Sequence, residues 1–360
     1  MTPAGHSPDA KDPASPDPLT IFSLKRQGIL ITILVFILLA SASIALAAGA
    51  YTISLADVYG ILFEHLVPFL NNPMREPVLD TIVWDMRMPR ILMAIAAGAA
   101  LAAAGAVYQG CFRNPLVDPF ILGVSSGAAF GAALGIVFPS FFLSIQFSAF
   151  LFGALAVAGA YLLSRTGGYT HALTLILAGI VIASVFDGLV SILKYISTDA
   201  ALRTIVFWIM GGFYYASWGD VRLNLTIVVI SCVILVLLAW KLNILSLGDE
   251  ESRALGVDPQ ALTIIFVVIA TLLTAIVTAT VGIIPWVGLM MPHAARMILG
   301  PDHRAVIPAA ALLGGIYLLV CDTLARTLTG AEIPVGIIAS ILGAPYLFYL
   351  IRTRGQTAFG

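Results

Sequence analysis

The chain has 360 residues, of which 60% are hydrophobic and only 10% are charged, with 18 Lys and Arg against 19 Asp and Glu. Soluble domains carry about 25% charged residues, so this composition excludes an ordinary soluble protein, and its hydrophobicity excludes a disordered one. The net charge of −1 argues against a nucleic-acid partner, and three cysteines cannot build a disulfide framework. An integral membrane protein made mostly of spans remains.

The N-terminal stretch 1–27 differs from the rest of the chain. It alternates polar residues with prolines at positions 3, 8, 13, 16 and 18, which predicts a disordered cytoplasmic tail. Lys25 and Arg26 precede the first apolar run. That run is about 20 residues long, beyond the 7–15 of a signal-peptide core, so we interpret it as an uncleaved first span.

The remaining sequence predicts an all-α polytopic membrane protein with about ten transmembrane helices, because a span needs about 20 apolar residues. The expected spans lie near 29–48, 89–109, 119–139, 145–164, 173–193, 221–240, 260–282, 284–299, 307–328 and 335–351. They form one transmembrane domain, 28–352, followed by a short cytoplasmic tail, 353–360. Their Gly and Ala content favours close helix packing within a bundle.

The distribution of Lys and Arg predicts the orientation. With ten spans and a cytoplasmic N-terminus, eleven basic residues fall inside: Lys11, Lys25, Arg26, Arg113, Arg165, Lys241, Arg253, Arg296, Arg304, Arg352 and Arg354. Seven fall outside: Arg75, Arg87, Arg90, Lys194, Arg203, Arg222 and Arg326. We therefore expect a multi-pass protein of the cytoplasmic membrane with both termini in the cytoplasm.

Two connections between spans are long. The outside loop 49–86 contains an amphipathic stretch, and the inside loop 241–259 carries the acidic run Asp249-Glu250-Glu251. A structured inside loop of this length indicates either a docking site for a partner or a solvated connector.

Four glycines recur every fourth residue, at Gly123, Gly127, Gly131 and Gly135, which predicts a helix face for close packing. The same stretch matches G-x-S-x-G. A nucleophile elbow needs a strand before it, however, and a membrane span precedes this motif, so we interpret Ser125 and Ser126 as small packing residues.

Motifs for metal binding and nucleotide binding are missing from the sequence. There is no H-E-x-x-H, no Cys/His cluster with metal spacing and no G-x-x-x-x-G-K-[ST]. We expect no catalytic residue, metal or cofactor in this chain, and any ATP and Mg²⁺ must be bound by a partner.

Ionisable residues within the spans are few. Asp187 lies in the fifth span, and its carboxylate could serve as the relay of an ion-coupled carrier or line a water-filled path. Asp322 and Arg326 are four residues apart near the outer end of the ninth span, so they share a helix face and can pair. The doubly proline-broken segment from Asn114 to Pro119 indicates a re-entrant turn.

Five groups of motifs, in this order, resemble the permease subunits of the FecCD/BtuC family of type II ABC importers. They are Arg87-Met88-Pro89-Arg90 with Gly98, Gly105 and Gln109; Asn114-Pro115-Leu116 through Pro119 with Leu122-Gly123-Val124-Ser125; Leu247-Gly248 with Leu255-Gly256-Val257; Gly282 to Gly300 with Asp302-His303-Arg304; and Asp322, Arg326, Glu332 to Gly336 and Gly343-Ala344-Pro345. The resemblance covers roughly 28–352. Pro285 and Trp286 depart from the usual small residue and Phe, which predicts an altered local helix geometry.

The resemblance implies partners for both faces. Arg87, Arg90 and Arg326 match positions that present arginines to an extracytoplasmic substrate-binding protein, whose carboxylates would steer docking. The inside loop matches two short helices that dock on two ATP-binding cassette subunits; its candidate coupling residues are Leu247, Gly248, Glu250, Glu251, Ser252, Leu255 and Gly256. A second permease copy would complete the pathway, with a homodimer expected.

The resemblance also implies a gate at the inner end of the pathway. Asn114 and Leu116 match gate positions, Thr170 and His171 match the inner turn before the fifth span, and Asp187 lies on the expected path. The implied function is ATP-driven import of a metal chelate, such as an iron–siderophore, haem or cobalamin. An ion-coupled secondary transporter using Asp187 is the alternative.

Overall fold

The computed structural model describes residues 18–49, 51–67, 77–140, 144–165 and 172–358, and these residues form helices without strands. In chain order the elements are α1 (Pro18–Ala47), α2 (Leu55–Leu66), α3 (Pro77–Asp80), the π-helix η2 (Thr81–Arg87), α4 (Met88–Cys111), α5 (Val124–Val137), α6 (Ile145–Ser164), α7 (Ala172–Ile196), α8 (Asp199–Met210), α9 (Trp218–Leu245), α10 (Asp249–Ala254), α11 (Pro259–Val281), α12 (Val287–Leu299), α13 (His303–Thr327) and α14 (Val335–Ala358).

Seven helical stretches of the described chain are long and apolar enough to cross a membrane: Lys25–Ala47, Pro77–Cys111, Ile145–Ser164, Ala172–Ile196, Trp218–Leu245, Pro259–Val281 and His303–Thr327. Three shorter apolar helices, Val124–Val137, Val287–Leu299 and Val335–Tyr346, complete the set. The ten regions correspond in order to the ten expected spans, which confirms the all-helical membrane fold. Helix α8 is an additional element that the span pattern did not predict.

The first helix begins earlier than the sequence predicts. α1 starts at Pro18, within the stretch expected to be a disordered tail. No Pro or Gly interrupts residues 19–27, and proline is well suited to the first position of a helix, so the helix extends back to Pro18. At the other end of the chain, α14 likewise continues through most of the expected C-terminal tail.

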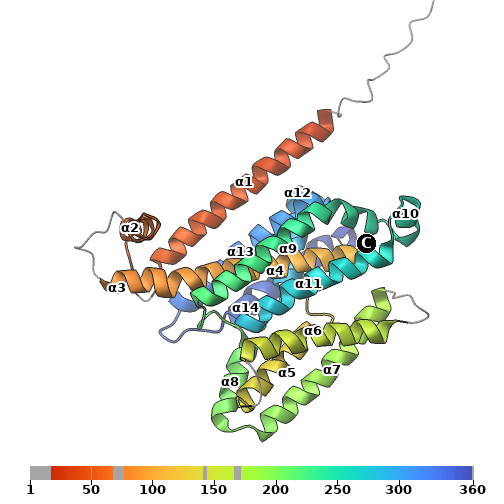
Figure 1. Cartoon of the computed structure of the whole chain (residues 1–360). Helices are drawn as coiled ribbons and strands as arrows, with labels where there is room; N and C mark the ends of the chain where they lie inside the picture. The colour runs from red at the N-terminus through yellow and green to blue at the C-terminus, as the bar shows by residue number, and fades with distance from the viewer. Residues whose placement is uncertain (1–17, 50, 68–76, 141–143, 166–171, 359–360) are drawn as a thin grey trace, which may run out of the picture.

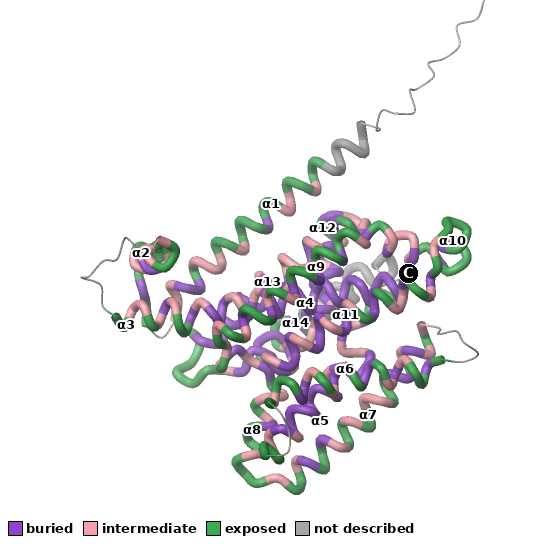
Figure 2. The backbone as a smooth tube through the Cα atoms, viewed as in Figure 1, coloured by how far each residue is buried: buried purple, intermediate pink, exposed green. Residues whose placement is uncertain are grey.

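Helix α4 lies at the centre of the bundle, with α9, α11, α12 and α13 packed around it and buried residues along its whole length (Figures 1 and 2). Its small residues allow this packing. A Cβ atom at Gly98 would overlap the carbonyl oxygen of Gly314 on α13, and one at Gly105 would overlap that of Gly288 on α12. The backbones therefore meet directly, as small residues permit in membrane helices.

Helices α5 to α8 form a second group beside this central bundle (Figure 1). The two groups meet where α6 and α5 pack against α11. We call the two ends of the molecule the α2 end, which contains α2, α3 and the connections 211–217 and 328–334, and the α10 end, which contains α10 and the connections 112–114 and 300–302.

The segment 112–123 enters the bundle before α5 begins. Pro119 packs against Gly288 at the start of α12, and Ile121 packs against Gly179 in α7. Gly123, with φ of 86°, then turns the chain into α5. This course agrees with the re-entrant turn expected from the two prolines, and it shortens the expected span 119–139 to a helix that starts at Val124.

Helix α12 also starts inside the bundle, at an unusual turn. Trp286 has φ of 76°, a left-handed conformation that costs free energy in a bulky residue. Its side chain packs close to Gly343 of α14. Trp286 is one of the two positions where the sequence departs from the family that it resembles and where an altered local helix geometry is expected.

Candidate functional site

Three arginines meet at the α2 end, where α13 runs beside α4. Arg87 ends η2, Arg90 lies in the first turn of α4 and Arg326 lies in the last turn of α13; the three residues are 6%, 8% and 9% exposed. Two carboxylates, Asp322 and Glu332, complete a cluster that we call the arginine network. Three guanidinium groups against two carboxylates leave one excess positive charge in it.

Asp322 holds the network from the inside. Its side chain is fully buried; Oδ1 accepts a 2.8 Å hydrogen bond from Nε of Arg90, and Oδ2 lies 3.2 Å from Nε of Arg326. The four-residue spacing on α13 therefore produces the predicted Asp322–Arg326 pair. A buried carboxylate is costly unless it is paired, so two guanidinium partners explain how Asp322 is tolerated there.

Arg87 and Arg326 are also bound to the connection that follows α1. Arg87 donates hydrogen bonds to the main-chain carbonyl groups of Leu46, Ala47 and Tyr51. Arg326 donates to those of Ala45 and Ala48. Since carbonyl groups at a helix end lack partners within the helix, these arginines cap the end of α1.

Arg90 joins the buried part of the network to the surface. Its Nη1 donates a 2.7 Å hydrogen bond to Oε2 of Glu332, whose side chain is 42% exposed. Its buried Nη2 has no hydrogen-bond partner among the described residues. The guanidinium carbon lies 5.6 Å from the centre of the Tyr214 ring, and burial raises the pKa of that phenol to about 12. The Arg90–Glu332 pair is thus the exposed edge of the network.

The sequence predicts Arg87, Arg90 and Arg326 as an outward docking surface. The structure does bring them together at one end, but it directs their guanidinium groups to internal partners, and Glu332 is the one exposed residue of the network. The docking role itself stays a prediction. The sequence marks Glu332 only as part of a motif, because its pairing with Arg90, 242 residues away, has no local sequence signal.

The α10 end carries the predicted coupling segment. One six-residue helix, α10, stands where the resemblance implies two, because α9 runs on to Leu245 and α11 begins at Pro259. Gly248 and Gly256, with φ of 141° and 77°, make the turns on either side of α10. The apolar side chains of Leu247 and Leu255 are 63% and 58% exposed beside the exposed Glu250 and Glu251.

Two contacts fix α10 to the bundle. The buried Ser252 donates to the carbonyl groups of Gly248 at 2.6 Å and Ile244 at 3.1 Å, which ties α10 back to the end of α9. Arg113, which follows α4, forms a 3.1 Å ion pair with Asp249. α10 is therefore connected to the end of α9 through Ser252 and to the end of α4 through Arg113.

The gate residues that fall within the described chain lie next to α10. Asn114 and Leu116 are exposed, and the Asn114 Oδ1 accepts a 2.9 Å hydrogen bond from the Leu116 amide. Asn114 and Leu247 line one cavity of about 550 Å³, together with residues from α4, α9, α12 and α13. Thr170 and His171 lie outside the described residues.

The exposed side of α7 combines apolar residues with a polar stripe. Ser184, Asp187, Gly188 and Ser191 recur at helical spacing and are all exposed, while the two serine hydroxyls bond to carbonyl groups of their own helix. The exposed positions of α9 between Val229 and Trp240 are all apolar. The predicted path residue Asp187 thus points away from the described chain and has no ion pair within it.

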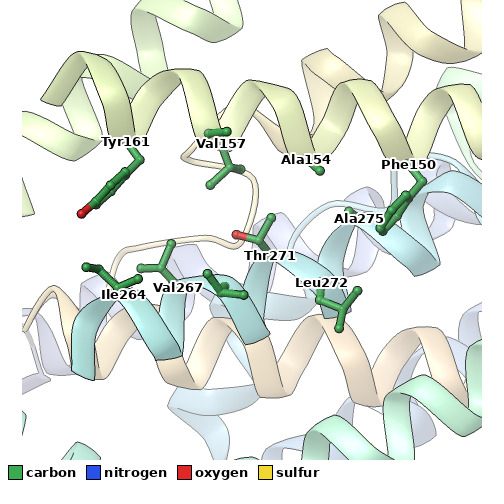
Figure 3. Close-up of a pocket in the computed structure, with 11 residues that line it drawn as sticks. Phe150, Ala154, Val157, Tyr161, Ile264, Val267, Thr271, Leu272 and Ala275 are labelled. Carbon is green, nitrogen blue, oxygen red and sulfur yellow. The ribbon is translucent and has the colours of Figure 1, made fainter. Parts of the chain in front are cut away.

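Helices α6 and α11 border an apolar groove of about 460 Å³ (Figure 3). Phe150, Ala154 and Val157 of α6 face Val267 and Leu272 of α11 across it (Figure 3). Thr271 also lines the groove, and its hydroxyl lies 2.9 Å from that of the buried Tyr108. This lining suits hydrocarbon and offers no charged group to a metal chelate.

The repeated glycines of α5 lie where the pattern places them, with one difference. Cβ atoms at Gly127 and Gly131 would overlap carbonyl oxygens of Phe152 and Ser148 on α6, so the two backbones are in contact. Gly135 faces Ile145, which also lies on α6. Gly123 instead precedes α5 as its cap. Over the described residues, no three His, Cys, Asp or Glu side chains are grouped to hold a metal ion.

Comparison with known proteins places this geometry in context. The model of the FecCD transport family matches residues 33–353. The molybdate import system permease protein MolB of Haemophilus influenzae is 38% identical over 327 residues, 90% of this chain and 96% of that protein. The hemin transport system permease protein HmuU of Yersinia pestis is 38% identical over 338 residues, 91% and 96% of the two chains.

A solved structure described as an inward-facing conformation of a metal-chelate type ABC transporter has the same fold. It superposes with a TM-score of 0.81 at 37% identity and covers 90% of this chain and 99% of that chain. The shared fold extends over nearly all of the matched structure.

Proposed function

Because this chain belongs to the FecCD transport family and is the permease subunit of an ABC importer of the FecCD/BtuC type, we propose that it carries a metal chelate across the cytoplasmic membrane by ATP-driven alternating access. The chelate class comprises iron–siderophores, haem and cobalamin. Relatives named for molybdate and for hemin are equally similar to this chain, so identity does not favour one cargo.

The observation that carries this proposal is the polar stripe on the exposed side of α7. A charged side chain such as Asp187 is costly against lipid, so this face needs water or protein in front of it. A second copy of the chain, facing the first through α7, would enclose a polar path. The scarcity of ionisable groups within the spans suits a bulky cargo that passes without tight binding.

The two ends of the molecule suit different partners. At the α10 end, the exposed leucines and acidic residues of the coupling segment offer a surface for two ATP-binding cassette subunits, which would bind ATP and Mg²⁺. At the α2 end, the excess positive charge of the arginine network suits the carboxylates of an extracytoplasmic substrate-binding protein. Both termini would then lie in the cytoplasm.

The test is transport by the complete importer in proteoliposomes. Uptake should require ATP inside and should stop when the nucleotide-binding lysine of the ATPase is replaced. The cargo is identified by a thermal-shift panel of iron–siderophores, haem, cobalamin and molybdate on the substrate-binding protein. Uptake that persists without the ATPase and stops in Asp187→Asn would instead support an ion-coupled secondary transporter.

Coupling is tested in the same system at α10. Replacing Leu247 and Leu255 by Ala should reduce substrate-stimulated ATP hydrolysis and uptake together, because both side chains are exposed at the proposed ATPase contact. Leu237→Ala on the exposed side of α9 removes an equally large exposed leucine away from that contact and is the matched control. Equal activity of the two variants would contradict the coupling role of α10.

A further inference from the structure

The two carboxylates of the arginine network differ in accessibility. Asp322 is fully buried between Arg90 and Arg326, whereas Glu332 reaches Arg90 from the surface. Removing Asp322 from its partners would leave a buried charge unpaired, which is strongly unfavourable. Moving Glu332 from Arg90 to solvent costs less, because the Glu332 side chain is already 42% exposed and Arg90 keeps Asp322 on its Nε. The Arg90–Glu332 contact is therefore the one in the network that opens at the lowest cost.

The other arginine contacts cannot open in the same way. The guanidinium groups of Arg87 and Arg326 are bound to main-chain carbonyl groups around the end of α1, so freeing them would strand those carbonyls. Among the described residues, the Arg90 side chain makes no hydrogen bond to the main chain, its Nη1 is bound to Glu332, and its buried Nη2 has no hydrogen-bond partner.

The backbone around Glu332 does not need to move for the pair to open. The next residue, Ile333, donates its amide to the carbonyl of Ala325 on α13 at 3.2 Å, and α14 begins two residues later at Val335. The connection is thus fastened directly beside Glu332. Rotation of the side chain alone releases Arg90.

We propose that Glu332 occupies the place of an incoming carboxylate, so that the docking of the substrate-binding protein exchanges Glu332 on Arg90 for an acidic side chain of that protein. This inference rests on the proposed function. Nη1, vacated by Glu332, and Nη2, which is buried while Glu332 is in place and has no hydrogen-bond partner in the described chain, present a two-pronged donor of the kind that binds a carboxylate in bidentate fashion. Asp322 positions Arg90 by holding Nε and is not exchanged.

In this exchange Glu332 competes with the carboxylate of the substrate-binding protein for Arg90, so removing the charge of Glu332 should strengthen binding. In the complete importer in lipid nanodiscs, Glu332→Gln should bind the substrate-binding protein about two- to fivefold more tightly, a gain set by the strength of a partly exposed ion pair. Asp85→Asn is the matched control, because Asp85 is exposed at the same end and has no ion pair in the described chain. It removes the same charge without freeing Arg90.

A double-mutant cycle with Arg90→Gln separates the exchange from general charge effects. Arg90→Gln should weaken binding at least about tenfold and abolish the gain from Glu332→Gln. If the single variant does not fold, Arg90→Lys replaces it, because lysine keeps the positive charge beside Asp322 but lacks the two-pronged donor.

Three results would overturn the exchange. Weaker binding by Glu332→Gln would show that Glu332 itself contacts the substrate-binding protein. A gain in binding no larger than that of Asp85→Asn would show that the gain is a long-range charge effect. In both cases a loss by Arg90→Gln leaves the proposed docking intact. Unchanged binding by Arg90→Gln overturns the exchange and the docking site together, while ATP-driven uptake tests the proposed function separately.

Discussion

At the scale of single residues, Asp322 shows how much one side chain organises. Its side chain is fully buried and balances two guanidinium groups, one from α4 and one from its own helix α13. We expect Asp322→Asn to lower the free energy of unfolding by about 3–5 kcal/mol, because it leaves Arg90 and Arg326 buried with fewer negative partners.

The measurement for Asp322 is the melting midpoint of the purified permease in detergent. Glu332→Gln is the control, since its partly exposed pair contributes less than about 1 kcal/mol. If the two variants melted at the same temperature, Asp322 would not be the support of the network.

Asp302 is a second residue with a calculable effect, at the start of α13. Burial acts to raise its pKa, but hydrogen bonds from the Arg304 side chain and amide and from Asn243 outweigh this and hold it at about 2, below the ordinary 3.8. The stabilisation is therefore fully present above the ordinary pKa and is lost as the pH falls through about 2.

We expect Asp302→Asn to cost about 1–2 kcal/mol at pH 6 after allowance for partial exposure, and only a few tenths of a kcal/mol at pH 2, where about half of the carboxyl groups are protonated. Melting curves of the variant and the unchanged protein between pH 6 and pH 2 test this. Arg304→Gln should reproduce part of the loss at pH 6, because it removes the same ion pair. A difference that stayed constant over this range would refute the assignment.

At the scale of elements, the fold depends on helices whose backbones touch. Gly98 and Gly314 bring α4 and α13 together with no room for a side chain. Overpacking typically costs about 1–3 kcal/mol, and here the obstacle is backbone, which cannot rotate away. We therefore expect Gly98→Ala to lower the melting midpoint and to broaden the transition.

The control for Gly98 is Gly28→Ala. Gly28 lies in α1 with nothing within 4 Å of an added Cβ, so alanine should be neutral there or stabilise the helix by up to about 1 kcal/mol. Opposite signs for the two substitutions would assign the effect to the crossing of α4 and α13. Equal effects would contradict it.

The order and type of the membrane helices could be predicted from apolar length alone, because a span must be long and apolar wherever it sits. Their ends could not. α5 starts at Val124 rather than near Pro119, because packing partners of the preceding segment, such as Gly179, lie far away in the sequence. Helix α8 was missed because it is short and amphipathic.

The candidate site shows the same limit. The pairing of Asp322 with Arg326 follows from a four-residue spacing, but the pairing of Arg90 with Glu332 depends on the packing of α4 beside the connection between α13 and α14. The burial of all three arginines has the same origin. Sequence motifs indicated which residues matter at the α2 end without indicating which of them is exposed.

At the scale of the whole molecule, the exposed sides of α7 and α9 should face different surroundings. The polar stripe of α7 requires water or protein, whereas the apolar side of α9 suits lipid. We expect Ser184→Cys on α7 to react with a water-soluble maleimide in nanodiscs and Val229→Cys on α9 to remain unreacted, because the reactive thiolate forms only where water reaches the sulfur.

The labelling is carried out with Cys232 replaced by Ser, since Cys111 and Cys321 are buried. Transported substrate should slow the labelling of the Ser184→Cys variant, because a cargo in the path between two permease copies shields that face of α7. Equal, slow labelling of the two variants would place both helices against lipid. The polar stripe would then lie outside the path, and the proposed pairing of two copies through α7 would fail.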